Sequence, residues 1–110
     1  ELVLYSNDPY EDANGGSARL REVREHWRRN KADTERTAVS HLALNVSGGV
    51  AYLDVLCSQT AGYSVSGVRV SPPSDPNNIT WDGLVTAHEL GHNFGSLHTH
   101  CYRGIAGNIF

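Results

Sequence analysis

Methionine is absent from the 110-residue chain, even at position 1. The chain opens at Glu1 directly on a strand-like stretch, and residues 107–110 supply no closing element. We therefore expect the sequence to be an excerpt of a larger protein. On that interpretation the lack of a visible targeting segment excludes nothing about where the protein resides.

Long apolar runs and an excess of positive charge are also missing. No run approaches the roughly 18 apolar residues of a membrane-spanning helix. The 9 Lys and Arg residues are outnumbered by 12 Asp and Glu residues, a net charge of -3 that argues against a nucleic-acid partner. The basic stretch at 19–29 is interrupted by Glu22 and Glu25, which is typical of a solvated helix face. Nothing in these patterns predicts the oligomeric state.

Cysteine is scarce, with Cys57 and Cys101 the two present. They could bond to each other, could each pair with a cysteine elsewhere, or could both be free thiols. Their spacing does not choose among these alternatives.

The hydrophobic content of 39% and charged content of 19% are typical of a globular chain, and the length allows one domain. Apolar patterns predict strands over 2–5, 38–46, 50–57 and 63–70. Leu20, Val23 and Trp27 recur at helical spacing, which predicts a helix over 18–29 with Ser17 as its N-cap. Three of the four prolines lie in 71–78, which we expect to be irregular. Strands before and between helices predict a layered α/β domain.

The stretch 88-HELGHNFGSLHTH-100 holds four of the six histidines. Its first seven residues belong to a predicted helix over 81–94 that stops at Gly95. Side chains four apart on a helix lie about 5–6 Å apart on one face, so His88 and His92 can bind one ion. Glu89 lies about a quarter-turn away, where a carboxylate reaches a water on the ion rather than the ion itself. The alternative is a surface helix carrying two solvated histidines.

Residues after the helix favour the metal site over that alternative. Gly95 can take the left-handed conformation that ends a helix, and the chain can then return His98 to the same ion. His100 lies close enough to compete with His98, although its distance from Gly95 fits less well. On the helix itself we expect Ala87, Leu90 and Phe94 to form an apolar back, opposite the histidines.

Residues 88–98 match H-E-x-x-H-x-x-G-x-x-H, and the chain resembles the metzincin metalloproteases that carry this zinc signature. The amino-acid sequence of residues 87–95 is most similar to that of the reprolysin (adamalysin) branch. The segment 48–53, followed by Cys57, resembles the cleft-edge strand of that branch. The resemblance implies a zincin-like α/β (α+β) fold with a twisted mixed sheet and an active-site helix. Residues 1–110 would then be a partial catalytic domain, with the lower subdomain truncated.

The same resemblance implies that His88, His92 and His98 ligate Zn²⁺ and that Glu89 is the general base. It further implies a secreted protein with a peptide or protein substrate that pairs with the edge strand. Cysteine partners for Cys57 and Cys101 would lie beyond Phe110. Two features depart from the family: Thr99 replaces the usual Asp, and the methionine-containing turn is missing.

The favoured function is a zinc-dependent endopeptidase. A non-catalytic zinc-binding module is the rival, and an inactive fragment of a protease is a third hypothesis. The other histidines have simpler interpretations. We expect His41 to be a hydrogen-bonded core histidine and His26 to be solvated.

Overall fold

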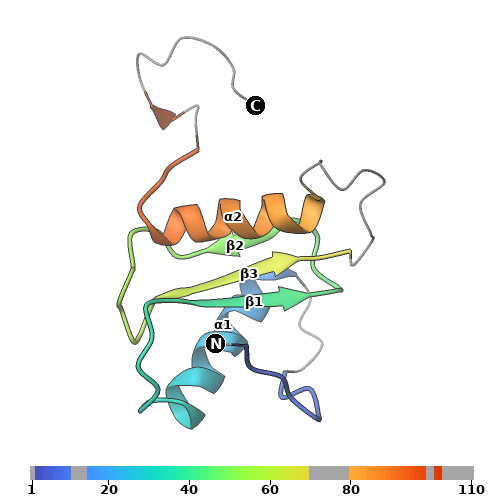
Figure 1. Ribbon diagram of the computed structural model, residues 1–110, viewed down its shortest axis with the longest axis vertical. Helices are drawn as coiled ribbons and strands as arrows, with labels where there is room; N and C mark the ends of the chain where they lie inside the picture. The colour runs from blue at the N-terminus through green and yellow to red at the C-terminus, as the bar shows by residue number, and fades with distance from the viewer. Residues whose placement is uncertain (1, 11–14, 70–79, 99–100, 103–110) are drawn as a thin grey trace.

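The computed structural model describes residues 2–10, 15–69, 80–98 and 101–102 (Figure 1). Its elements are α1 (Gly16–Asn30), β1 (Val39–Ala43), β2 (Gly49–Ala51), β3 (Tyr63–Gly67) and α2 (Trp81–Asn93). The predicted irregular segment 71–78 lies outside the described residues. Apart from the expected strand over 2–5, the helices and strands follow in the order expected from the sequence.

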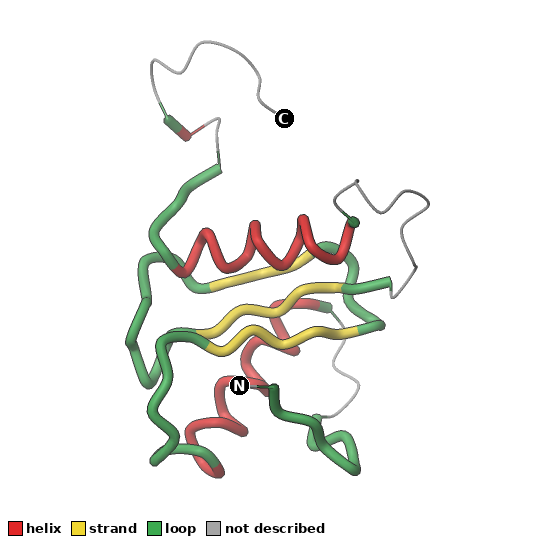
Figure 2. The backbone as a smooth tube through the Cα atoms, viewed as in Figure 1, coloured by secondary structure: helices red, strands yellow, loops and turns green. Residues whose placement is uncertain are grey.

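The strands form one mixed sheet in the order β1-β3-β2. β1 runs parallel to β3 with Val39 opposite Tyr63, whereas β2 is antiparallel to β3 with Val50 opposite Val65. Figures 1 and 2 show α1 on one side of the sheet and α2 on the other. The expected α+β domain with a mixed sheet is therefore confirmed.

The central strand β3 is buried along its whole length because helices cover both of its faces. Tyr63 and Val65 are fully buried and join a core to which α1 contributes Leu20, Val23 and Trp27. The spacing of these three apolar residues in the sequence predicted this packing correctly.

Several strand boundaries differ from those expected. Residues 2–5 form no strand: this segment pairs with none of the described strands, and Leu2 and Leu4 are exposed. β2 ends at Ala51 because the following chain turns, with Asp54 and Cys57 at positive φ. The expectation that residues 50–57 form a strand covered on both faces is wrong for this second half.

The helix α1 begins earlier than expected. Gly15 is its N-cap, at φ 94°, and Ser17 lies within the first turn instead of capping it. Glycine adopts this left-handed backbone without the steric cost that a side chain brings. Neither α1 nor α2, the helices of the described residues, is long and apolar enough to cross a membrane.

Candidate metal centre

The helix α2 starts and stops at local sequence signals. The hydroxyl oxygen of Thr80 accepts a hydrogen bond from the backbone N–H of Gly83, which caps the first turn. After Asn93 the chain turns at Gly95, whose φ of 88° suits glycine. Gly95 and Ser96 donate backbone hydrogen bonds to the carbonyls of His92 and Gly91. This turn directs the following residues back towards the helix, as expected.

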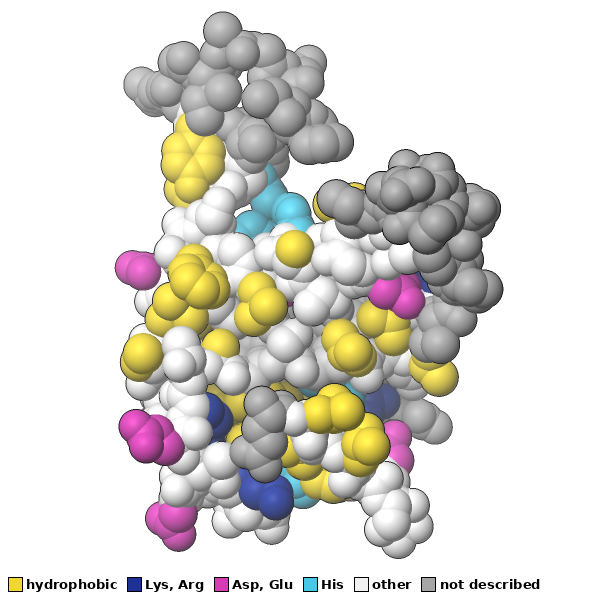
Figure 3. Space-filling model, in the orientation of Figure 1, with side chains coloured by type: hydrophobic (Ala, Val, Ile, Leu, Met, Phe, Trp, Pro, Cys, Tyr) yellow, Lys and Arg dark blue, Asp and Glu magenta, His cyan; other side chains and the backbone are white. Residues whose placement is uncertain are grey.

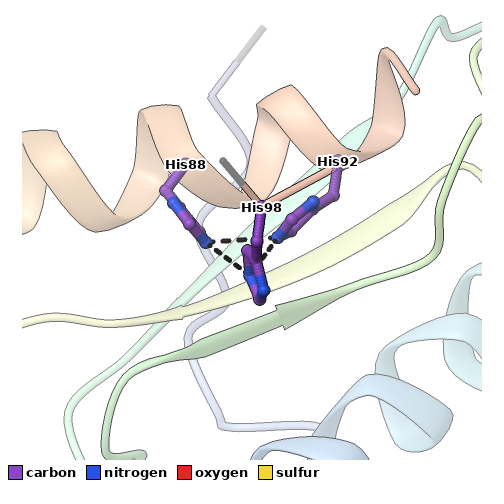
Figure 4. Close-up of side chains that lie close together, drawn as sticks. All are labelled: His88, His92 and His98. Carbon is purple, nitrogen blue, oxygen red and sulfur yellow. Dashed lines mark hydrogen bonds between the residues drawn. The ribbon is translucent and has the colours of Figure 1, made fainter. Parts of the chain in front are cut away.

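The side chains of His88, His92 and His98 converge (Figure 4). The Nε2 atom of His88 lies 3.1 Å from that of His92 and 3.2 Å from that of His98. The Nε2 atoms of His92 and His98 are 3.1 Å apart. Nitrogen ligands of a tetrahedral zinc ion at about 2.0–2.1 Å lie roughly 3.3–3.4 Å from one another. The triangle therefore fits three of the four positions around zinc.

One hydrogen bond determines the tautomer of His92. Its Nδ1 atom lies 2.7 Å from the carbonyl oxygen of Ser96, which can only accept, so Nδ1 carries the proton. In the neutral ring the Nε2 lone pair then points at the other two histidines. Partners of this kind orient metal-binding imidazoles. The donor set is thus suited to a cation.

The histidine cluster is accessible. His88 and His98 are exposed and His92 is partly exposed. Figure 3 shows histidine side chains (cyan) emerging at the surface. An exposed cluster can receive a molecule at the position that the three imidazoles leave open.

In contrast to the histidines, Glu89 is buried, with only 5% of the residue exposed. Burial raises the pKa of its carboxyl group, and the nearby His92 and His98 oppose that rise. Its side chain packs against Gly49 of β2: a Cβ built on Gly49 would lie 2.5 Å from Glu89 Cγ. The carboxylate expected to act beside the metal therefore lies between α2 and the edge strand.

The buried face of α2 is not the one predicted. Ala87 and Phe94 are exposed and Leu90 is partly exposed, so the expected apolar back is wrong. The row Val85, Glu89 and Asn93 is buried against the sheet instead. Both faces carry apolar residues, and polar contacts to the strands decide between them.

Asn93 was missed by the sequence analysis. It is fully buried, and its Nδ2 donates to the carbonyl oxygens of Tyr52, at 2.7 Å, and Tyr63, at 3.2 Å. The backbone N–H groups of Asp54 and Val55 donate to the carbonyls of His92 and Asn93. The end of the metal-site helix is thus tied to the chain leaving β2. In the sequence, the place of Asn93 between His92 and Gly95 was the feature that could have identified it.

His26, His41 and the two cysteines lie outside the cluster. The ring of Tyr10 contacts His41, at 4.7 Å between centroids, and His26, at 5.4 Å. His26 packs against an aromatic ring and is partly exposed, so the expectation that it is solvated holds in part. Cys57 and Cys101 are exposed and free. Thr99 and His100 lie outside the described residues.

Comparison with known protein families shows to which family the chain belongs. The family model described as metallo-peptidase family M12, of the reprolysin group, matches residues 3–107. The chain belongs to this family. No curated protein and no solved structure matches it. The resemblance to reprolysins inferred from the sequence is confirmed.

Membership of the M12 family gives the histidine cluster its context. The family is zinc-dependent, and the described part of this M12 chain brings together three histidines able to hold a metal ion. A metallo-peptidase acts on peptide or protein, so the substrate class follows from the family.

Proposed function

We propose that this M12 chain is a zinc-dependent endopeptidase in which His88, His92 and His98 bind the metal and Glu89 is the general base. The observation that carries the proposal is the convergence of three Nε2 atoms at 3.1–3.2 Å from one another. Three imidazoles leave one position of a tetrahedral ion open, which is the pattern of catalytic rather than structural zinc.

A bound zinc ion supplies a Lewis acid that polarises the scissile carbonyl and makes a nearby water far more acidic, with a pKa of about 7. The Glu89 carboxylate accepts the proton of the attacking water and returns it to the departing amine. Burial raises the pKa of Glu89, which makes its carboxylate a better base than an exposed one. This scheme needs no Ser or Cys nucleophile.

The strand β2 is the element that we propose aligns the substrate. It pairs with β3 alone among the described strands, so its other edge offers backbone N–H and C=O groups to an extended peptide. Gly49 of β2 contacts Glu89, and the edge strand is therefore adjacent to the proposed base. A peptide added to this edge passes beside the carboxylate.

The rival function is a zinc-binding module without catalysis. Hydrolysis of an unfolded protein substrate by the zinc-loaded chain, lost with a chelator and in Glu89→Ala, supports the endopeptidase. Glu89→Ala should keep about one zinc per chain, because Glu89 is not a ligand. Zinc binding without hydrolysis, in a chain shown to be folded by circular dichroism, favours the rival instead.

We also propose that the protein is secreted, a property supported by its resemblance to reprolysins. The test is expression of the full-length protein in its own cells with separate assay of medium and cell extract. Retention of the protein inside the cell contradicts the proposal.

A further inference from the structure

Gly49 occupies a place where any side chain would collide with the proposed base. A Cβ built on its backbone would lie 2.5 Å from Glu89 Cγ, 2.6 Å from Oε1 and 2.7 Å from Cδ. These separations are far below the 3.5–4.0 Å, or about that, at which carbon atoms pack. The Glu89 side chain lies in space that exists because residue 49 is glycine.

The backbone of Gly49 does not itself require glycine. Positive φ occurs at its neighbour Gly48, at 72°, but Gly49 is not among the residues with positive φ. Gly49 pairs with Ser66 as an ordinary strand residue. An alanine could adopt the same backbone conformation, so the contact with Glu89 is the constraint at this position.

The contact between Gly49 and Glu89 determines the direction of the whole Glu89 side chain. Cγ is placed by the first side-chain torsion, and staggered rotamers leave few alternatives. Movement of the helix cannot easily relieve the collision, because Asn93 Nδ2 and the carbonyl of His92 hold its last turn to Tyr52 and Asp54. A side chain at 49 would therefore turn the Glu89 carboxylate to another rotamer.

We propose that Gly49 is a positioning residue: its missing side chain sets the Glu89 carboxylate beside the histidine cluster. The inference rests on the proposed function of Glu89. It also means that one short strand performs two tasks. The backbone edge of β2 aligns the peptide, and the absence of a side chain at Gly49 positions Glu89. The same strand therefore sets the position of the base relative to the peptide.

The test is Gly49→Ala, with Gly48→Ala as the matched control. In the zinc-loaded chain, Gly49→Ala should lower kcat by about 100-fold, the cost of a small misplacement, with KM changed by less than about twofold. Zinc content should stay near one per chain. Gly48→Ala has open space around its Cβ and strains only the backbone, so it should lower stability while kcat stays unchanged.

A second measurement needs no activity. Gly49→Ala should lower the denaturation midpoint when Glu89 is present and not in the Glu89→Ala background, where the space is empty. An equal loss in both backgrounds overturns the inference, as does wild-type kcat in Gly49→Ala or a kcat that falls only in step with zinc content. If Glu89→Ala itself retains hydrolysis, the proposed function fails, and the two backgrounds still report whether the contact exists.

Discussion

The side-chain amide of Asn93 donates a hydrogen bond of 2.7 Å to the carbonyl oxygen of Tyr52. This bond joins the last residue of α2 to the chain that leaves β2. Because His92 precedes Asn93, the bond also fixes a proposed zinc ligand relative to the edge strand. The helix that carries the proposed zinc ligands and the strand proposed to align the peptide are therefore held to each other by this bond.

Replacing Asn93 should destabilise the fold, and the relative stability of two variants should show that its side-chain amide is a hydrogen-bond donor. Asn93→Ala removes the side-chain donor to the carbonyl of Tyr52 and leaves the carbonyl of Tyr63 with the backbone N–H of Tyr52, so it should cost about 1–3 kcal/mol. Asn93→Asp keeps the shape but places a carboxylate against two carbonyl oxygens, so it should cost more than alanine. Chemical denaturation of the zinc-free chain measures both. An Asp variant more stable than the Ala variant would contradict the assignment.

Single alanine substitutions should separate zinc ligands from bystanders. Loss of His88, His92 or His98 should weaken zinc binding by more than about 100-fold, since loss of a mere supporting partner costs up to that amount. His100→Ala should keep near-wild-type affinity, as should the control His41→Ala. Competition with a chromogenic zinc chelator gives the affinities. Loss of binding in His100→Ala but not in His98→Ala would exchange their roles.

Gly95→Ala and Gly91→Ala should act in opposite directions. Gly95 has a φ of 88°, and a Cβ there would lie 3.1 Å from Asp54 Oδ1, so alanine should cost more than about 1 kcal/mol and weaken zinc binding. Gly91 is helical with 3.9 Å to its nearest neighbour, so alanine should stabilise by up to about 1 kcal/mol. Denaturation midpoints decide, and equal effects would refute the role of the turn.

Zinc should stabilise the chain by mass action. At a free zinc concentration of 100 times Kd, the gain in unfolding free energy should be about 2.7 kcal/mol. Thermal scans with zinc and with EDTA measure it. The His88→Ala variant is the control, because it should show little difference between the two conditions. A wild-type midpoint indifferent to zinc would be inconsistent with the site.

Acid should weaken the zinc-free fold through His41 and His26. Burial lowers the pKa of both side chains, and nearby Arg19 adds to the effect at His41 and Lys31 at His26. The unfolded chain then binds more protons than the folded chain just below the ordinary pKa of about 6.5. Stability contributed by these neutral rings is present above that value and decreases as the pH falls through it.

The measurement is urea denaturation in EDTA between neutral and mildly acid pH. His41→Gln, which cannot titrate, should show a smaller loss of stability over that interval than the wild-type chain. An unchanged dependence on pH would mean that His41 contributes nothing to acid sensitivity.

Local patterns predicted much of this molecule. The spacing of His88 and His92 depends on helix geometry alone, and the turn at Gly95 depends on a conformation that glycine adopts readily. Leu20, Val23 and Trp27 pack as their spacing indicates, for the same reason. Each of these features involves residues close together in the chain, so the sequence carries the information directly.

Contacts between distant segments decided the rest. Which face of α2 meets the sheet depended on Asn93 finding carbonyl partners 41 and 30 residues away, and no helical period records such partners. The segment 2–5 has the pattern of a strand but pairs with none of the described strands. By itself the sequence determined the histidine signature and its family, because these are local. Only the tertiary structure placed Glu89 against Gly49, because that contact joins a helix to a strand 40 residues earlier in the chain.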